Sequence, residues 1–255
     1  MDTSKSTGSV DALPRRVVFC VDVGLEMKET LGSSVDGGIQ HSLLQTSSRL
    51  ETTLFLIRRY IAMNQLIASS DQYAVVLLQD KAKWWVGFSN DLDEIEVALQ
   101  GIECHEYKEI FGRKDVNDLL ITIAGHSDLS DQRYFTQVIL IYGRAQHLPL
   151  SMSKVHRRVI RDSQRFTMDV LFLHGPSDTR CKVIYETLQS FDSRTVPGWY
   201  FEFRPMARSS FTKAMAQLVA HPSQRSDRRS ASQVLEPVNA PEEDMISLDS
   251  DAGQG

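Results

Sequence analysis

One segment near the start of the chain most constrains the fold. Residues 16–22, RVVFCVD, are almost continuously apolar, rich in β-branched side chains, and end in an aspartate. A strand with one wet face would alternate apolar and polar residues, so this run predicts a strand covered on both faces. Strands of that kind lie in parallel sheets, which need helical crossovers, and 255 residues suffice for one large α/β domain.

Strand-like and helix-like segments alternate along the rest of the chain. Strands are expected at residues 72–80, 82–89, 133–143, 166–175 and 198–205, and helices from near Ser42 and at 89–102, 115–127, 153–165, 178–191 and 209–220. The strand at 82–89 follows its predecessor too closely for a crossover, so it should form an antiparallel hairpin at the edge of the sheet. The sequence therefore predicts an α/β, Rossmann-like fold with a mainly parallel sheet and helices on both faces.

The ends of the chain differ from its middle. Residues 1–14 are polar, and residues 222–255 have few aliphatic and no aromatic side chains and turn from basic to acidic. Such segments bury too little apolar area to offset the entropy of ordering. We expect a disordered tail over 1–14, one domain over 15–221 and a disordered tail over 222–255.

Bulk composition excludes several classes of function. The net charge of −5 argues against a general nucleic-acid binder, and no apolar run approaches the length of a membrane span. The N-terminal residues lack the apolar core of a secretory signal, and three widely spaced cysteines suggest no disulfide framework or zinc pattern. We expect an intracellular protein that binds neither nucleic acid nor membrane.

The end of the first strand is where a ligand would bind in an open parallel sheet. Asp22, Gly24 and Glu26 occupy alternate positions there. The arrangement resembles the von Willebrand factor A domain, whose metal site combines Asp-x-Ser-x-Ser after the first strand, a threonine from a second loop and an aspartate after the central strand. In this chain Lys114 falls at the threonine position, and Arg144 stands where the last aspartate is expected.

Two interpretations of this degenerate site remain. A relaxed metal site would use Asp22, Glu26 and Asp115, whereas the alternative is that Asp22 caps the turn and pairs with a nearby cation. Magnesium requires nearly octahedral oxygen ligands, and a lysine and an arginine directed at such a site would repel the ion. We favour the second interpretation and predict that the domain binds no metal and no other cofactor.

No other pattern in the sequence indicates catalysis. The histidines form no HxH or HExxH pair, and no glycine-rich phosphate loop follows any strand, so we expect no enzyme activity. Trp84 and Trp85 are neighbours on the hairpin strand and must face opposite sides of the sheet. Burial of both in the core is the favoured interpretation, and exposure of one to a partner is the alternative.

Pro222, Ser223, Gln224 and Arg225 follow the last predicted helix. In exposed, extended chain, a proline and a forked guanidinium could dock in a groove that carries a carboxylate, although a plain helix stop would also explain them. Residues 242–251, EEDMISLDSD, place apolar side chains among acids and could form a short linear motif or a phosphorylation site.

Several stretches together resemble one family, the von Willebrand factor A-like scaffold subunit of the BRISC and BRCA-A deubiquitinase complexes. They are CVDVGLEM at 20–27, VILIYGR at 138–144 and AMAQLVAHPSQR at 214–225, followed by an acidic tail. The resemblance implies a non-catalytic adaptor in an assembly that removes lysine-sixty-three-linked ubiquitin, in the cytoplasm and nucleus, with a role in the DNA damage response.

The same resemblance implies the partners and the contact residues. The adaptor would dock onto a subunit built from ubiquitin-conjugating-enzyme-like domains through Pro222 to Arg225, and would contact the zinc metalloprotease and its inactive partner only indirectly. One alternative is another intracellular subunit of the superfamily, such as a proteasomal ubiquitin receptor or a transcription-repair factor. The other is a metal-dependent ligand-binding domain.

Overall fold

The computed structural model describes residues 13–31, 47–106, 115–145, 163–175, 179–203 and 208–225. Six strands form one sheet: β1 (Arg15–Asp22), β2 (Gln72–Leu78), β3 (Ala82–Ser89), β4 (Phe135–Tyr142), β5 (Phe166–Leu173) and β6 (Tyr200–Phe203). The helices described are α1 (Arg49–Gln65), α2 (Leu92–Gln100), α3 (Asp115–His126), α5 (Thr179–Gln189) and α6 (Arg208–Gln217), with short 3-10 helices η1 (Leu25–Lys28) and η2 (Pro222–Gln224).

The sheet has the strand order β3-β2-β1-β4-β5-β6. β1 pairs in parallel with both β2 and β4, and the only antiparallel pairing among these strands joins β2 to β3 at the edge. The predicted α/β class, with one antiparallel edge strand, is confirmed. The direction of winding reverses between β1 and β4, and in open α/β sheets ligands bind at the carboxyl ends of strands at such a switch point.

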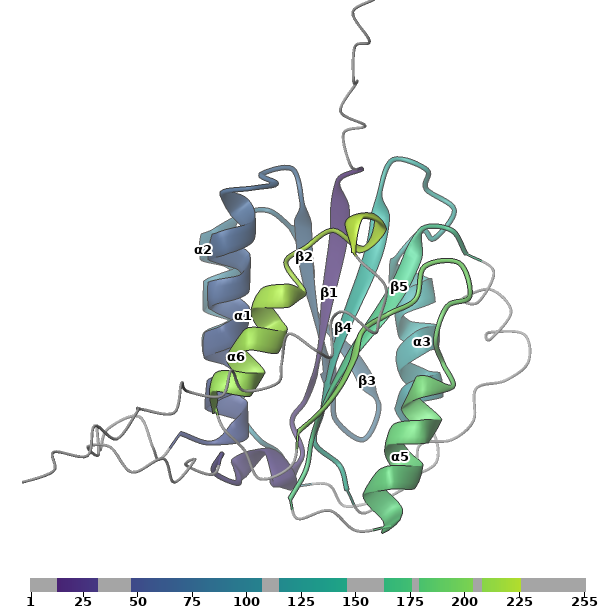
Figure 1. The fold of residues 1–255 in the computed structure, drawn as a ribbon. Coiled ribbons are helices and arrows are strands. Elements are labelled where there is room, and N and C mark those ends of the chain that lie inside the picture. Colours follow the sequence, from purple (N-terminus) through teal and green to yellow (C-terminus); the bar gives the residue numbers. More distant parts are fainter. Residues whose placement is uncertain are drawn as a thin grey trace, which may run out of the picture. The chain divides into compact units, whose positions relative to one another are not determined.

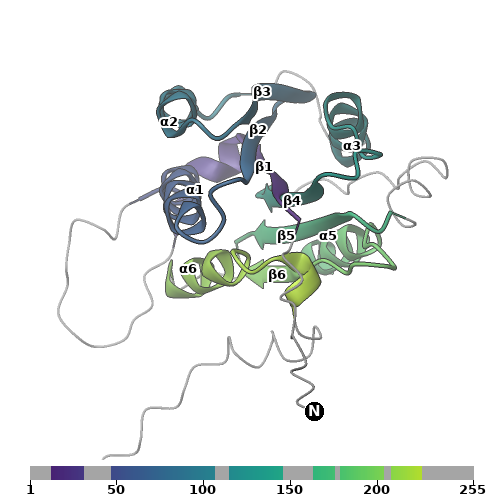
Figure 2. The ribbon, with the colours of Figure 1, turned by 90° about the horizontal axis from the view of Figure 1, so that it is seen from above.

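Helices cover both faces of the sheet. α1, α2 and α6 lie on one side, and α3 and α5 lie on the other, as the view along the sheet in Figure 2 shows. β1, β2, β4 and β5 are buried along nearly their whole length. The continuous apolar run of the first strand therefore has the cause inferred from the sequence, which is cover on both faces.

Local sequence signals explain where two of the helices begin. Ser48 caps α1 and forms a reciprocal capping box with Glu51, so the helix starts at Arg49 and not near Ser42 as predicted. Asp91 caps α2 by accepting hydrogen bonds from the backbone of the first turn, and Gly101 ends that helix, which lies within the predicted range 89–102.

The compact unit extends to Arg225, four residues beyond the predicted domain end at 221. η2 continues from α6 along the sheet, as Figure 1 shows. The predicted helix at 153–165 lies mostly outside the described residues, as does the motif at 242–251. No helix in the described part of the chain is long and apolar enough to cross a membrane.

Candidate functional site

The Asp22 carboxylate lies at the switch point and is fully buried. Its Oδ1 accepts hydrogen bonds from the Gly24 amide and from Arg144 Nε, both at 3.0 Å. Its Oδ2 accepts a hydrogen bond from the Gly143 amide, also at 3.0 Å. Asp22 therefore caps the turn and pairs with a cation, which is the second of the two interpretations drawn from the sequence.

The Arg144 guanidinium spans the carboxyl ends of β1 and β2. Its side chain is 4% exposed, and Nη2 donates to the backbone carbonyls of Leu78 at 2.7 Å and Gln79 at 3.1 Å. Without Arg144, these carbonyl oxygens could have served as ligands of a bound cation. A guanidinium of the protein itself thus binds the Asp22 carboxylate at the end of β1, where the von Willebrand factor A pattern supplies its first metal ligand.

Close packing fixes the loop that presents Arg144. A Cβ added at Gly143 would lie 2.6 Å from Met27 Sδ and 3.5 Å from Asp22 Oδ2. Met27 belongs to η1, which follows β1, and is fully buried. A residue larger than glycine at 143 would push the Met27 side chain away, whereas its contact with the Asp22 carboxylate would be an ordinary one.

These residues do not fit a hard divalent cation. Both Asp22 oxygens are already bound to N–H donors, and Gly24 has no side-chain oxygen at all. Magnesium needs about six oxygen ligands at about 2.1 Å, and Arg144 would have to leave before the ion could approach. Among the described side chains, no three histidine, cysteine or acidic residues form a group that could hold a metal ion.

The remaining members of the predicted site are less well placed. Lys114 lies outside the described residues, as does the side chain of Asp115. Glu26 lies within η1, where its backbone carbonyl accepts a hydrogen bond from Arg49 Nη1 at 3.1 Å. The structure therefore joins Asp22, Gly24 and Arg144 and leaves the position of Lys114 undescribed.

A second polar cluster, which the sequence reading missed, lies toward the opposite end of the sheet. Arg15 at the start of β1 is 2% exposed and donates to both carboxylate oxygens of Asp71 at 2.7 Å. It also reaches Asn64, the Gln137 amide oxygen at 3.1 Å and the Val219 carbonyl at 3.0 Å. Burial lowers the pKa of Arg15, but the Tyr60 hydroxyl and the Asp71 carboxylate more than offset this, and the net shift is upward.

The same network continues through Gln137 to Asp169 and Arg225. Gln137 Nε2 donates to Asp169 Oδ2 at 2.9 Å and to the Leu218 carbonyl at 3.1 Å. Arg225 donates to both oxygens of Asp169, at 2.6 Å from Nη1 and 3.0 Å from Nη2. The two side chains are only 3% and 0% exposed, so this is a buried, bidentate ion pair.

This geometry corrects the expectation that Pro222 to Arg225 lie in exposed, extended chain. Pro222 is buried in η2, and the Arg225 guanidinium also stacks over Trp199, 4.7 Å from the ring centroid. Ser223 and Gln224 are the exposed members of the segment. The sequence could not reveal this ion pair, because Asp169 lies in a mainly apolar strand, 56 residues before Arg225. No local pattern connects the two residues.

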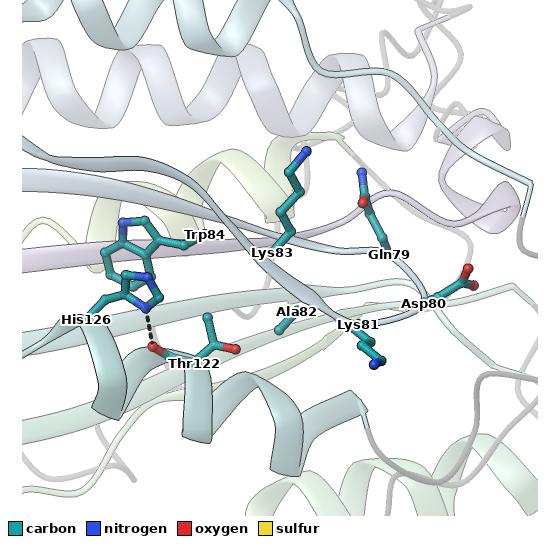
Figure 3. A pocket seen from close by; sticks show the side chains of 8 residues that line it. All are labelled: Gln79, Asp80, Lys81, Ala82, Lys83, Trp84, Thr122 and His126. Atoms are coloured by element: carbon teal, nitrogen blue, oxygen red, sulfur yellow. Dashed lines mark hydrogen bonds between the residues drawn. The ribbon is translucent and has the colours of Figure 1, made fainter.

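A pocket of about 810 Å³ lies between the β2–β3 hairpin and α3 (Figure 3). The indole of Trp84 stacks on the His126 imidazole there, with ring centroids 4.6 Å apart, and His126 Nδ1 is 2.9 Å from the Thr122 carbonyl oxygen. Trp85 faces α2, where its Nε1 donates to the Ala98 carbonyl at 2.9 Å. Both tryptophans are therefore partly exposed and packed against a helix, one on each face of the hairpin.

Two cysteines and one histidine of the described residues are buried in the packed interior. Cys20 and Cys181 are buried, and burial raises the pKa of the Cys20 thiol. His174 is 2% exposed and lies between the Gly175 carbonyl and Glu202, whose Oε1 is 3.2 Å from Nε2. A thiol whose pKa is raised is a poor nucleophile at neutral pH.

Comparison with known proteins supports both the fold and the family. No protein-family model matches the chain. The chain is 23% identical over 220 residues to BRISC and BRCA1-A complex member 1 of Xenopus tropicalis, covering 83% of this chain and 67% of that protein. It is 23% identical over 236 residues to the protein of that name in Danio rerio, covering 87% and 60%, and 21% identical over 233 residues to the one in Homo sapiens, covering 87% and 68%.

The chain is thus similar to this protein over most of its own length, at low identity. The resemblance identified from the sequence is thereby confirmed. The chain spans only about 60% to 68% of the length of these three relatives.

Solved structures with the same fold are von Willebrand factor A-like. The SpRpn10 VWA domain superposes with a TM-score of 0.51 at 9% identity, covering 85% of this chain and 100% of that domain. BatB from Bacteroides thetaiotaomicron gives 0.52 at 12% identity, covering 83% and 100%. Proximal thread matrix protein 1 from the mussel byssus, described with a zinc-occupied MIDAS motif, gives 0.53 at 11% identity, covering 82% and 45%.

Proposed function

We propose that the protein is a non-catalytic scaffold subunit of a BRISC or BRCA1-A type complex that cleaves lysine-sixty-three-linked ubiquitin. The names of its relatives support membership of such a complex. The proposal that the subunit is non-catalytic is supported by the buried ion pair between Asp22 and Arg144 at the switch point of the sheet. In this proposal, a domain whose switch point is closed by its own ion pair acts through its surface.

In this proposal, the domain stabilises the complex by binding to a partner subunit. The six-stranded sheet holds its helices rigidly, and the domain contributes a surface of fixed shape to the assembly without touching the ubiquitin bond. A pre-organised surface loses little conformational entropy on binding, so a rigid domain stabilises a complex efficiently. The isopeptidase chemistry belongs to a zinc metalloprotease subunit that pairs with an inactive partner of its own fold.

The direct partner in this proposal is a subunit built from ubiquitin-conjugating-enzyme-like domains. Ser223 and Gln224 are exposed next to the buried Pro222 and the Arg225–Asp169 pair, so the segment is presented in one fixed conformation. Arg225 then acts as the anchor that shapes the contact, and Ser223 and Gln224 offer polar groups to the partner. We place the assembly in the cytoplasm and nucleus, with a role in ubiquitin signalling and the DNA damage response.

Co-purification from cells tests the proposal. A tagged copy of the chain should bring down a zinc isopeptidase and a conjugating-enzyme-like subunit, and the isolated chain should cleave no ubiquitin chain. The double substitution Ser223→Asp and Gln224→Asp should weaken docking with little loss of folding stability, since both side chains are exposed. Absence of both subunits from the purified material would refute the assignment.

A further inference from the structure

Exposed apolar side chains gather along α1 and α2. Ten large apolar residues are exposed in the described part of the chain, and six of them belong to these two helices or to the two residues after α1. They are Phe55, Met63, Leu66, Ile67, Leu92 and Val97. Single exposed apolar residues are ordinary, whereas a gathering of them marks an interaction surface.

The end of α1 is the most exposed part of this surface. Leu66 is 89% exposed and Ile67 is 77% exposed. Helical spacing places Phe55, Ala62 and Leu66 along one stripe of α1, at i, i+7 and i+11. This stripe is separate from the buried one that faces the sheet.

A groove runs between α1 and α2, which lie side by side in Figures 1 and 2. Its α1 wall contains Ile61 and Ala62, and its α2 wall contains Leu92, Ile95 and Leu99. The volume of about 260 Å³ is below that of a typical small-molecule pocket but large enough to receive apolar side chains of another protein.

The groove is formed before any partner binds. Arg58 Nε donates to Glu96 Oε2 at 2.7 Å and so links α1 to α2. Gln65 Nε2 donates to the Asn90 carbonyl at 3.4 Å and ties the end of α1 to the start of α2. Binding there requires little reorganisation of this chain.

The charge beside the groove identifies the kind of partner. Asp91, Asp93 and Glu94 are all exposed around Leu92, and Asp93 lines the groove itself. Of the two arginines nearby, Arg58 pairs with Glu96, and Arg59 does not line the groove, since its guanidinium lies over the Phe55 ring at 5.7 Å from the centroid. The surface is therefore apolar with an acidic end, which complements an apolar segment that carries lysine or arginine.

The backbone of both walls is already paired within the helices, so the groove offers side chains and no sheet edge to an extended peptide. A helix satisfies its own backbone and presents apolar residues at i, i+3 or i+4, and i+7. We propose that the α1–α2 groove docks an amphipathic helix whose apolar stripe inserts between α1 and α2 and whose basic residues face Asp93 and Glu94. The proposal rests on the proposed function in one respect, since the helix is taken to belong to another subunit of the same assembly.

Photo-crosslinking in the intact complex tests this contact directly. p-Benzoyl-phenylalanine is placed at Leu66 and, as a matched control, at Val183 of α5, which is 44% exposed on the other face of the sheet. After irradiation in cells, mass spectrometry identifies the crosslinked peptide. We expect the probe at position 66 to label a helix of another subunit that combines an apolar stripe with lysine or arginine, and the probe at 183 to leave that helix unlabelled.

Substitutions measure the contribution of the groove. Ala62→Asp combined with Leu92→Asp, at the two exposed apolar residues that line the groove, should weaken assembly about tenfold or more, while Val183→Asp should leave it unchanged. Asp93→Asn with Glu94→Gln should weaken assembly several-fold and make it less dependent on salt. Thermal unfolding of each variant separates a loss of docking from a loss of folding.

Several results would overturn the proposal. One is a crosslink from position 66 to a second copy of this chain, or to an acidic or extended segment. A second is the absence of any crosslink in the intact complex. A third is binding of the chain to lipid vesicles that Leu66→Asp abolishes, since the apolar surface would then contact a membrane. If the wild-type chain brings down no isopeptidase, the proposed function fails, and the peptide crosslinked at position 66 still decides whether a basic amphipathic helix occupies the groove.

Discussion

Arg225→Ala should destabilise the folded domain strongly. The substitution removes two hydrogen bonds to Asp169 and leaves a carboxylate that is 0% exposed without its cation. Within the described segments, the Gln137 amide and the Trp199 backbone N–H are the donors that remain to it, at 2.9 Å and 2.8 Å. Breaking a buried pair by removing one partner costs about 3–5 kcal/mol, much of it the penalty for the unpaired charge that remains.

Urea unfolding followed by tryptophan fluorescence measures this cost. A loss of about 3–5 kcal/mol corresponds to a decrease in melting temperature of roughly 6–20 °C for a domain of this size. Gln224→Ala is the matched control, because its side chain is exposed one residue away and should change the free energy of unfolding by less than about 0.5 kcal/mol.

A double-mutant cycle identifies the source of the effect. Asp169→Asn removes the buried charge, so Asp169→Asn combined with Arg225→Ala should cost less than the sum of the two single changes by about 0.5–3 kcal/mol. A cost below about 1 kcal/mol for Arg225→Ala, or strict additivity in the cycle, would refute the reasoning. In the exposed, extended chain expected from the sequence, Arg225→Ala would leave the fold intact, and the buried pair reverses that expectation.

Three further predictions concern single groups. Burial, and then the charge of Arg15, lowers the pKa of His221 from its ordinary 6.5 to about 4. The folding stability should therefore be full above pH 6.5 and fall as the pH drops toward 4. In urea titrations at several pH values, His221→Asn should flatten this dependence. Iodoacetamide should label half-buried Cys104 in the folded protein, and Cys20 and Cys181 only after unfolding; mass spectrometry that finds all three labelled equally fast would contradict this. Ser48→Ala should cost about 1 kcal/mol in urea unfolding by removing the α1 cap, and an unchanged midpoint would count against that role.

The fold could be predicted from the sequence because its signals are local. The apolar run that ends at Asp22, the short link before the β3 hairpin and the cap at Asp91 each depend on residues within one element and its neighbours. The start of α1 was placed wrongly near Ser42, although Ser48 and Glu51 carry a capping-box pattern that could have located it. Strand and helix type followed from periodicity, whereas this boundary depended on one side-chain contact.

The candidate site could be predicted only in part, because its contacts join distant segments. Replacement of an aspartate by Arg144 was visible in the sequence once the von Willebrand factor A pattern was recognised, and it indicated a lost cation site. The hydrogen bonds from Arg144 to the end of β2, 65 and 66 residues earlier, were not visible. Arg15 and Arg225 are polar residues at the edges of apolar segments, and only the folded chain brings them to Asp71 and Asp169.

Arg144 supplies the positive charge that pairs with Asp22 at the switch point of the sheet, and no metal ion is needed there. Isothermal titration calorimetry with Mg²⁺ and Mn²⁺ on the full chain tests this most directly. We expect no saturable heat of binding at micromolar metal, either for the wild-type chain or for Asp22→Asn. Micromolar binding by the wild-type chain that disappears in Asp22→Asn would contradict it.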